Sequence, residues 1–471
     1  MSLTSAERLR RIFAIIPSSA MMFMDQSILP VALPVIQKEF GSSATSLQWA
    51  VNAYLLSWTV FVLLAGKIGD RIGHRVNYLW GMSLFALFSL LCGMSQSGEF
   101  LIGARALQGL AGAMLGPSQT ALISTSFPSV SRGRAVGIIA SIGSISLILG
   151  PLIGGILTEW LSWRWIFWIN LPIAALGIFL TILVLPKSPK REGKIDFLGF
   201  IYFALFSFFS TLVFMQGTSW GWGSRRVLAA GIVAFIAAIL LLRREKTSRN
   251  PFITLTLFKR PIFASINVSI AISQFILMIT VFRTIYTETI LGYTPTQTGI
   301  ITAFSSVPVF FFSYVGGFLS DKVSPKLPIA LGYCLIILSF FWLGNTPMPT
   351  LILYLIPLFF FGMGLPLIFT PSYTVAMSDI PEEQLGIAFG IVSMLRVFAG
   401  TIGLALIFAF TSWEKAIYLP NVGERIAEMM SFSSVHFLLG ILMVIAFLVS
   451  AFLYHRKSTH HLPSGPAEGW D

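Results

Sequence analysis

The stretch IFAIIPSSAMMFMDQSILPVALPVI, Ile12 to Ile36, decides the fold of this chain. It is longer than the roughly 20 apolar residues that an α-helix needs to cross about 30 Å of hydrocarbon. Only helices and closed barrels satisfy their backbone polar groups in lipid, and this stretch is too long for a barrel strand. It therefore predicts a transmembrane helix, and Asp25 places one carboxylate near its middle.

The composition extends this prediction to the whole chain. Of the 471 residues, 55% are hydrophobic and 11% are charged, and the mean hydropathy is +0.83, which is outside the range of soluble globular domains. The first apolar segment is longer than the apolar region of a signal peptide, so we expect it to be retained. We predict an all-α membrane protein with about 14 spans, near residues 12–36, 46–65, 76–96, 99–121, 134–158, 163–185, 196–217, 226–242, 262–287, 296–319, 327–344, 350–376, 385–411 and 433–454.

The net charge of +12 is explained by topology. If the N-terminus is cytoplasmic, most lysines and arginines fall in internal loops, as the positive-inside rule requires, and both termini lie inside. The basic excess therefore indicates topology, and we expect no nucleic-acid partner. We also expect a monomer that lies in the lipid bilayer of a bacterial cytoplasmic membrane. Cys92 and Cys334 both lie in predicted spans, which indicates neither a disulfide framework nor a metal site.

Two pairs of short motifs indicate an internal duplication. PSVSRGRAVG at 128–137 and PEEQLGIAFG at 381–390 share P-x4-G-x-A-x-G, while GKIGD at 66–70 and GFLSD at 317–321 share G-x3-D. Both pairs are about 250 residues apart, and duplicated halves are typical of transporters. We predict an N-terminal six-helix half at 1–190, two additional helices at 191–250, a C-terminal six-helix half at 251–456 and a cytoplasmic tail at 457–471.

The loop after the second predicted span reads GKIGDRIGHR, 66–75. Its glycines let two helices turn and pack closely, and Asp70 is placed to meet a helix N-terminus or an arginine. An ordinary cytoplasmic hairpin would have the same properties. The loop resembles the signature loop of the major facilitator superfamily, which implies a gating motif made of Gly66, Gly69, Asp70, Arg71, Gly73 and Arg75, with Asp321 in the second half.

Two further motifs lie inside predicted spans. LIGARALQGLAGA, 101–113, contains Arg105, which should face a carboxylate, water or the bundle interior because a bare cation in lipid is costly. LGPLIGGIL, 149–157, combines small residues for close helix contact with a proline that permits a bend. By resemblance to the same family, Arg105 is associated with proton coupling, and the second pattern accompanies antiporters: Gly150, Pro151, Gly154 and Gly155.

Three other segments narrow the resemblance. MDQSILPVALP at 24–34, QWAVNAYLL at 48–56 and WRWIFWINLP at 163–172 resemble the drug:proton antiporters with fourteen transmembrane helices. The resemblance covers most of the chain, from Met24 to about Gly403. It implies that proton and substrate contacts include Asp25, Gln26, Asn52 and Tyr54.

Three more ionisable residues lie within predicted spans. Arg396 resembles an arginine of the family, whereas Arg283 has no counterpart in the family pattern and Glu288 occupies a position usually held by glutamine. We include all three among the candidates for proton coupling or substrate binding. The alternatives are a solvated position near the external end for Glu288 and snorkelling to the interface for Arg283.

Together these features favour a proton-coupled antiporter that exports small amphiphilic or drug-like compounds by alternating access. Burial favours the neutral acid of Asp25 and a nearby Arg105 favours the carboxylate, so proton and substrate could compete there. The excess of arginines within the spans motivates the alternative, a transporter of an anionic metabolite or siderophore in either direction. A channel or receptor is disfavoured by the duplication. Without a P-loop, zinc spacing or nucleophile elbow, we expect no enzyme, cofactor or metal site.

Overall fold

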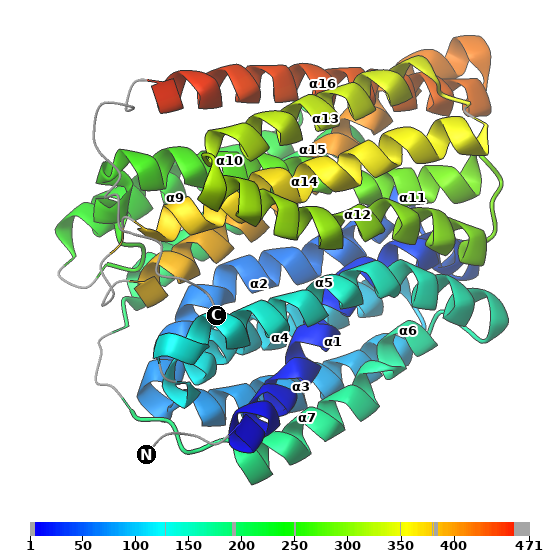
Figure 1. Cartoon of the computed structure of the whole chain (residues 1–471). Coiled ribbons are helices and arrows are strands. Elements are labelled where there is room, and N and C mark those ends of the chain that lie inside the picture. Colours follow the sequence, from blue (N-terminus) through cyan, green and yellow to red (C-terminus); the bar gives the residue numbers. More distant parts are fainter. Residues whose placement is uncertain are drawn as a thin grey trace.

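The computed structural model describes residues 5–127, 129–190, 195–248, 251–348, 350–378, 380 and 385–455. Every regular element in these residues is helical (Figure 1), which confirms the predicted all-α class. The elements are α1 (Ser5–Phe40), α2 (Ala44–Ile72), α3 (His74–Gly93), α4 (Gly98–Ser126), α5 (Ser129–Trp160), α6 (Trp165–Trp168), α7 (Asn170–Val184), α8 (Phe197–Trp220), α9 (Arg225–Thr247), the 3₁₀ helix η1 (Leu255–Lys259), α10 (Pro261–Leu277), α11 (Ile279–Thr289), α12 (Pro295–Lys322), α13 (Lys326–Asn345), α14 (Leu351–Ser378), α15 (Leu385–Val422) and α16 (Glu424–His455).

Within the described residues, 13 helical segments are long and apolar enough to cross a membrane. The short α6 joins α7 in one such segment, and α10 joins α11 in another. The helix α4, which carries Arg105, has 29 residues but does not belong to the 13. The count of fourteen spans therefore stays a prediction.

Helix ends follow local sequence signals. The side chains of Ser43 and Ser97 accept hydrogen bonds from backbone N–H groups in the first turns of α2 and α4, and Thr294 forms a capping box with Gln297 at the start of α12. Gly73 joins α2 to α3 with φ of 97°, a conformation that side chains with a Cβ rarely adopt. Capping residues and a glycine thus fix helix ends that hydropathy alone does not locate to the residue.

The two parts of the chain repeat one pattern of helix pairing. The helix α2 packs against α4 and α1 against α5, while α12 packs against α14 and α10 against α15. In Figure 1, α1–α7 occupy the lower part of the molecule and α10–α16 the upper part. The domain limits stay predictions, and several of the segments that define them lie outside the described residues: 191–194, 249–250, the tail at 457–471, and Pro128 and 381–384 of the repeated motif.

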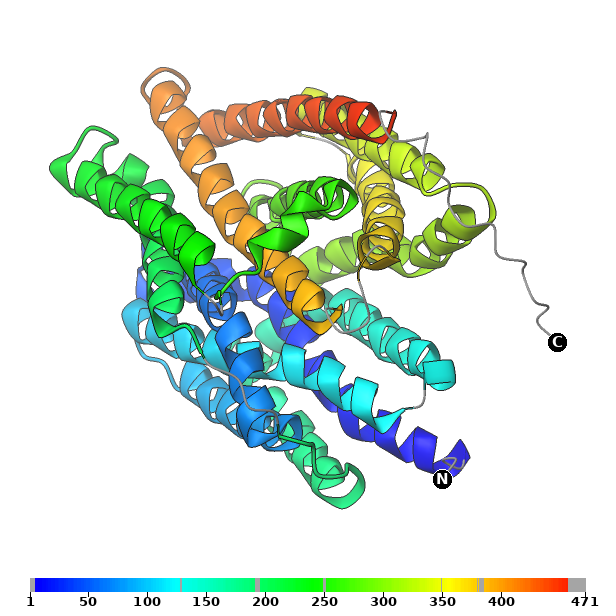
Figure 2. The ribbon, with the colours of Figure 1, turned by 90° about the vertical axis from the view of Figure 1, so that its left-hand side faces the viewer.

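The helices α8 and α9 form a hairpin beside the seam between α2 and α15 (Figure 2). The helix α8 contacts both, and the Asn52 amide nitrogen of α2 lies 3.0 Å from the Met215 sulfur of α8. The hairpin is held at its base, because Asp196 pairs with Arg244 at 3.1 Å. The α8–α9 hairpin thus contacts both parts of the molecule.

The helices α5 and α12 make the other large contact between the two parts. Their backbones approach at Gly155, where an added Cβ would collide with the Pro295 carbonyl. Beside this contact, the Glu159 carboxylate accepts a hydrogen bond of 2.9 Å from the backbone N–H of Thr296, in the first turn of α12. The positive end of the α12 dipole favours the carboxylate at this position.

Candidate functional site

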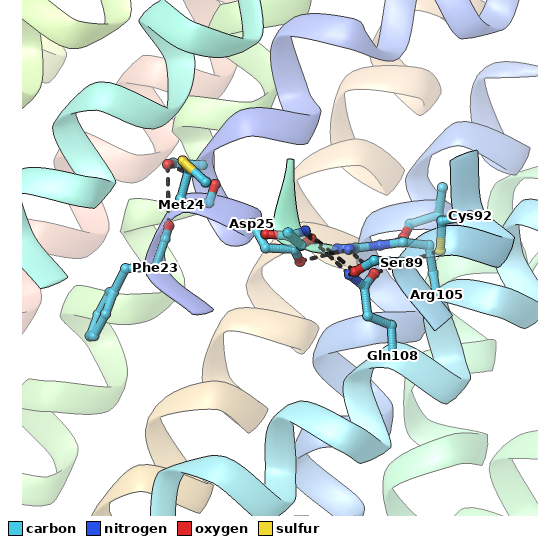
Figure 3. A network of polar contacts seen from close by, with 10 residues as sticks. Phe23, Met24, Asp25, Ser89, Cys92, Arg105 and Gln108 are labelled. Carbon is cyan, nitrogen blue, oxygen red and sulfur yellow. Dashed lines mark hydrogen bonds and ion pairs between the residues drawn. The ribbon is translucent and has the colours of Figure 1, made fainter. Parts of the chain in front are cut away.

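Asp25 lies in the centre of α1, between Pro17 and Pro30, and its residue surface is 1% exposed. Its Oδ2 lies 2.7 Å from the Arg105 Nη1 of α4, and Arg105 is also 1% exposed (Figure 3). The structure therefore places the carboxylate of the first span against the arginine of the fourth. Two opposite charges buried in contact compensate each other's loss of hydration only if their remaining hydrogen bonds are also satisfied.

Three further polar residues satisfy those hydrogen bonds. The Gln108 amide donates to Asp25 Oδ1 at 2.9 Å and to the Ser89 hydroxyl at 2.7 Å, and its oxygen accepts from Arg105 at 2.7 Å. The Asn170 amide donates to Asp25 Oδ1 at 3.4 Å. We call these five residues, Asp25, Ser89, Arg105, Gln108 and Asn170, the Asp25 network.

Sequence reasoning did not identify Ser89, Gln108 or Asn170. A signal existed for Gln108, which follows Arg105 by three residues and so shares its helix face. Asn170 lies within the quoted WRWIFWINLP segment, but nothing in the segment says which neighbour it meets. Ser89 carried no signal, because a serine in an apolar run can bond to its own helix backbone.

Aromatic rings and the backbone complete the surroundings of Arg105. Its Nε donates to the Ala50 carbonyl at 3.2 Å, and its guanidinium lies 4.3 Å from the centre of the Tyr54 ring and 5.8 Å from that of Phe167. Cation–π contact of this kind stabilises a desolvated cation. Of the other predicted residues, Tyr54 thus adjoins the network, whereas Asn52 contacts α8 and Gln26 is half-buried beside Asp25.

The remaining in-span charges lie away from this network. The half-buried Arg396 on α15 donates to Gln274 at 3.5 Å. Glu288 on α11 is half-buried, and one of its carboxyl oxygens is buried without a hydrogen-bond partner. Arg283 is 3% exposed, bonds to His436 and lines a small cavity between α11, α12 and α14. The structure does not bring these three side chains into the Asp25 network.

The loop motif joins α2 to α3. Asp70 pairs at 3.1 Å with His74, the first residue of α3, because the turn at Gly73 brings the start of α3 against the end of α2, so of the two predicted partners it is the helix N-terminus that Asp70 meets. Arg75 donates to the Ile182 carbonyl at 2.8 Å, which ties the loop to the end of α7, and Arg71 is exposed. Gly66 and Gly69 are in α2; Asp321 lies in α12, with its side chain outside the described part.

The predicted antiporter motif on α5 lies between the two parts of the molecule. An added Cβ at Gly150 would collide with Ser27, and one at Gly154 would lie 2.7 Å from Ile28, both on α1. Gly155 faces α12, and the Pro151 carbonyl packs against Gly299 of α12. The motif thus allows close backbone contact on two sides.

No group of three or more histidine, cysteine, aspartate or glutamate side chains in the described ranges could hold a metal ion.

Known proteins resemble this chain over most of its length. It is 33% identical over 412 residues to the multidrug resistance protein Stp of Mycobacterium tuberculosis, which covers 87% of this chain and 77% of the relative. It is 29% identical to the tetracenomycin C resistance and export protein of Streptomyces glaucescens, covering 86% and 78%. It is 30% identical to the riboflavin transporter RibZ of Clostridioides difficile, covering 83% and 85%.

The fold has solved counterparts. The crystal structure of a bacterial homolog to the human lysosomal transporter Spinster, in an inward-facing and unoccupied conformation, superposes with a TM-score of 0.69 at 15% identity, covering 96% of this chain and 99% of the other. Residues 15–404 match the model of the Major Facilitator Superfamily. The chain therefore belongs to the Major Facilitator Superfamily: it is a multi-pass membrane transporter of small molecules and not an enzyme.

Proposed function

We propose that this transporter exports small amphiphilic or drug-like compounds from the cytoplasm in exchange for protons. The observation that carries the proposal is the buried ion pair of Asp25 with Arg105, 2.7 Å apart inside the helix bundle. A titratable group inside a membrane protein is a candidate for a proton relay. The printed names of the multidrug resistance and tetracenomycin export relatives support export of drug-like compounds.

Protonation of Asp25 would change the balance of the network. The neutral acid no longer compensates the Arg105 charge, which would then rely on Gln108, the Ala50 carbonyl and the Tyr54 ring. A buried cation without its partner is costly, so the protonated state favours a different arrangement of α1 and α4. A proton would thus select one conformation of the transporter.

The helix α1 is well placed to transmit such a change. It packs against α5 in its own part of the molecule and against α11 in the other part. A shift of α1 would alter the tight contacts at Gly150 and Gly154, and through α5 the contact with α12. We propose that separation of α5 from α12 opens one side of the membrane, as alternating access requires.

The test uses purified wild-type protein in proteoliposomes with an imposed pH gradient, and tetracenomycin C as the probe. We expect the gradient to drive accumulation of the probe and a protonophore to abolish it. Transport that is equal with and without the gradient would contradict proton coupling. Protein-free liposomes measure the passive leak.

A second candidate is transport of an anionic metabolite or a siderophore, in either direction. It is favoured by Arg283, a buried cation without a carboxylate beside it in the described residues, and by the riboflavin transporter relative. Benzoate, an anion at pH 7, tested as a second probe in the same proteoliposomes, should be transported in preference to tetracenomycin C if this candidate holds. We place both termini in the cytoplasm and treat the transporter as a monomer in both schemes.

A further inference from the structure

Arg283 is a buried cation that is bonded on one side only. Its Nε lies 2.9 Å from His436 Nε2, and His436 Nδ1 lies 2.6 Å from the Phe432 carbonyl. The carbonyl must accept the Nδ1 proton, so Nε2 is the free lone pair that accepts from Arg283, and the imidazole is neutral. The two terminal nitrogens of Arg283 are buried and have no hydrogen-bond partner among the described residues.

The surroundings stabilise the cation only in part. The guanidinium lies 4.7 Å from the centre of the Phe361 ring and 5.2 Å from that of Phe340. Whereas Arg105 meets a carboxylate, no described carboxylate lies within ion-pair distance of Arg283. Four N–H donors of one buried guanidinium thus lack an acceptor, and a buried charge without a counter-charge is expensive.

Arg283 lines a small cavity, about 10 Å³ in volume, whose lining is partly apolar. Hydroxyl groups from three helices line it with the guanidinium, among them those of Thr284, Thr287, Ser305 and Tyr354. The Thr287 hydroxyl donates to the Arg283 carbonyl at 2.7 Å, so in its 3.0 Å contact with Tyr354 the tyrosine is the donor. Tyr354 therefore has a proton that it could give to an anion in the cavity instead.

We propose that this cavity widens as the transporter changes conformation and then binds the carboxylate of the transported compound, held by the terminal N–H groups of Arg283 and by the Tyr354 hydroxyl. A planar guanidinium and a carboxylate form two parallel hydrogen bonds, which suits the two free nitrogens. The substrate class is then an amphiphilic acid. The assignment of this carboxylate to a transported compound rests on the proposed function, while binding of the anion does not.

The position of the cavity fits this assignment. Arg283 lies on α11, and α11 packs against α1, which carries Asp25. The apolar side chains that line the cavity are Ile301 and Leu358, whereas Phe340 and Phe361 are buried beside the guanidinium and do not line it. The ion pair of Asp25 with Arg105 is already neutral, whereas Arg283 carries an uncompensated positive charge beside the cavity, which favours an anion.

The experiment measures equilibrium binding of radiolabelled benzoate to purified full-length protein in detergent, with neutral benzamide as the matched probe. We expect wild-type protein to bind benzoate at least tenfold more tightly than benzamide. Arg283→Gln should weaken benzoate binding by about 10- to 100-fold, the range of hydrogen bonds to a charged group, and leave benzamide unchanged. The control Arg226→Gln removes an arginine that also lies over an aromatic ring, Trp220, but on α9.

Three results would overturn the proposal: equal binding of benzoate and benzamide by the wild type, unchanged benzoate binding by a folded Arg283→Gln, or displacement of benzoate by equimolar chloride, which would indicate an inorganic-anion site. If gel filtration shows that Arg283→Gln does not fold, the variant Tyr354→Phe tests the proposal instead. It should bind benzoate a few-fold more weakly than the wild type and bind benzamide equally well. No proton gradient enters this assay. Benzoate binding without gradient-driven transport would thus contradict the proposed function and leave this site standing.

Discussion

Neutralising Asp25 is the perturbation that tests the site most directly. Asp25→Asn keeps the size of the side chain but removes the charge that faces Arg105 at 2.7 Å. The guanidinium then retains the Gln108 oxygen and the Ala50 carbonyl as acceptors and the Tyr54 ring as a neighbour. Arg105 thus loses its counter-charge but keeps two hydrogen-bond acceptors, so we expect the variant to fold.

The expected cost follows from the burial of the pair. Breaking a fully buried ion pair costs about 3–5 kcal/mol, and the remaining acceptors of Arg105 place this variant near the lower end, about 3 kcal/mol. A second variant, Asp25→Asn with Arg105→Gln, has no uncompensated charge. It should recover part of the lost stability. With the single variant Arg105→Gln measured as well, the coupling energy of the pair is the stability change of the double variant minus those of the two single variants.

Two assays read out the two roles of Asp25. Thermal unfolding of purified protein measures stability, and proteoliposomes measure transport with and without an imposed pH gradient. We expect Asp25→Asn to lose the gradient-driven component while substrate counterflow, which needs no proton movement, continues. Gradient-driven transport at the wild-type rate would refute the assignment of Asp25 as the proton site. Additive effects of the two substitutions on stability would refute the energetic importance of the pair.

Three further predictions concern Gln108, Gly155 and Asp196. Gln108→Leu removes a donor to the carboxylate and an acceptor from the guanidinium, and should lower unfolding free energy by about 2–3 kcal/mol and gradient-driven transport at least tenfold. Gly155→Leu should slow counterflow at least tenfold because its Cβ meets the α12 backbone, whereas Gly231→Leu, where a Cβ has space, should not. Desolvation raises the pKa of Asp196, but hydrogen bonds from Arg244 and a backbone amide outweigh it and leave the pKa below its usual value. The stability that this carboxylate contributes is therefore present above about pH 4 and lost as the pH falls through the lowered pKa. Asp196→Asn should reduce thermal stability at pH 7 by about 1 kcal/mol or less, and by less still in acid.

Several features of the structure could be predicted from particular residues. Each long apolar run became a helix, because a chain in lipid must satisfy its backbone within the segment. Asp25 and Arg105 were identifiable as candidates because a charge in such a run is costly wherever its partner lies. A turn between the second and third spans could be predicted from the loop at 66–75, but the choice of Gly73 over Gly66 and Gly69 as the residue between the helices could not.

Other features depended on packing between distant segments. Asp70 meets His74 because of the angle between α2 and α3 at Gly73, and a hydropathy profile does not predict the angle between two helices. The bond between Arg283 and His436 joins residues 153 positions apart, and nothing near either one identifies the other. The α2–α8 contact through Asn52 likewise depends on where the α8–α9 hairpin packs.

The sequence by itself determined an all-helical membrane protein, its family resemblance and the positions of its buried charges. These follow from local physics, since backbone hydrogen bonds and the cost of a charge in lipid act within one segment. Only the tertiary structure decided that Asp25 is paired and hydrogen-bonded by Gln108 and Asn170, and that Arg283 has no carboxylate in the described surroundings. The reason is that a polar side chain in a helix bundle is defined by the groups facing it, and those groups come from other helices whose rotation and tilt are set by packing.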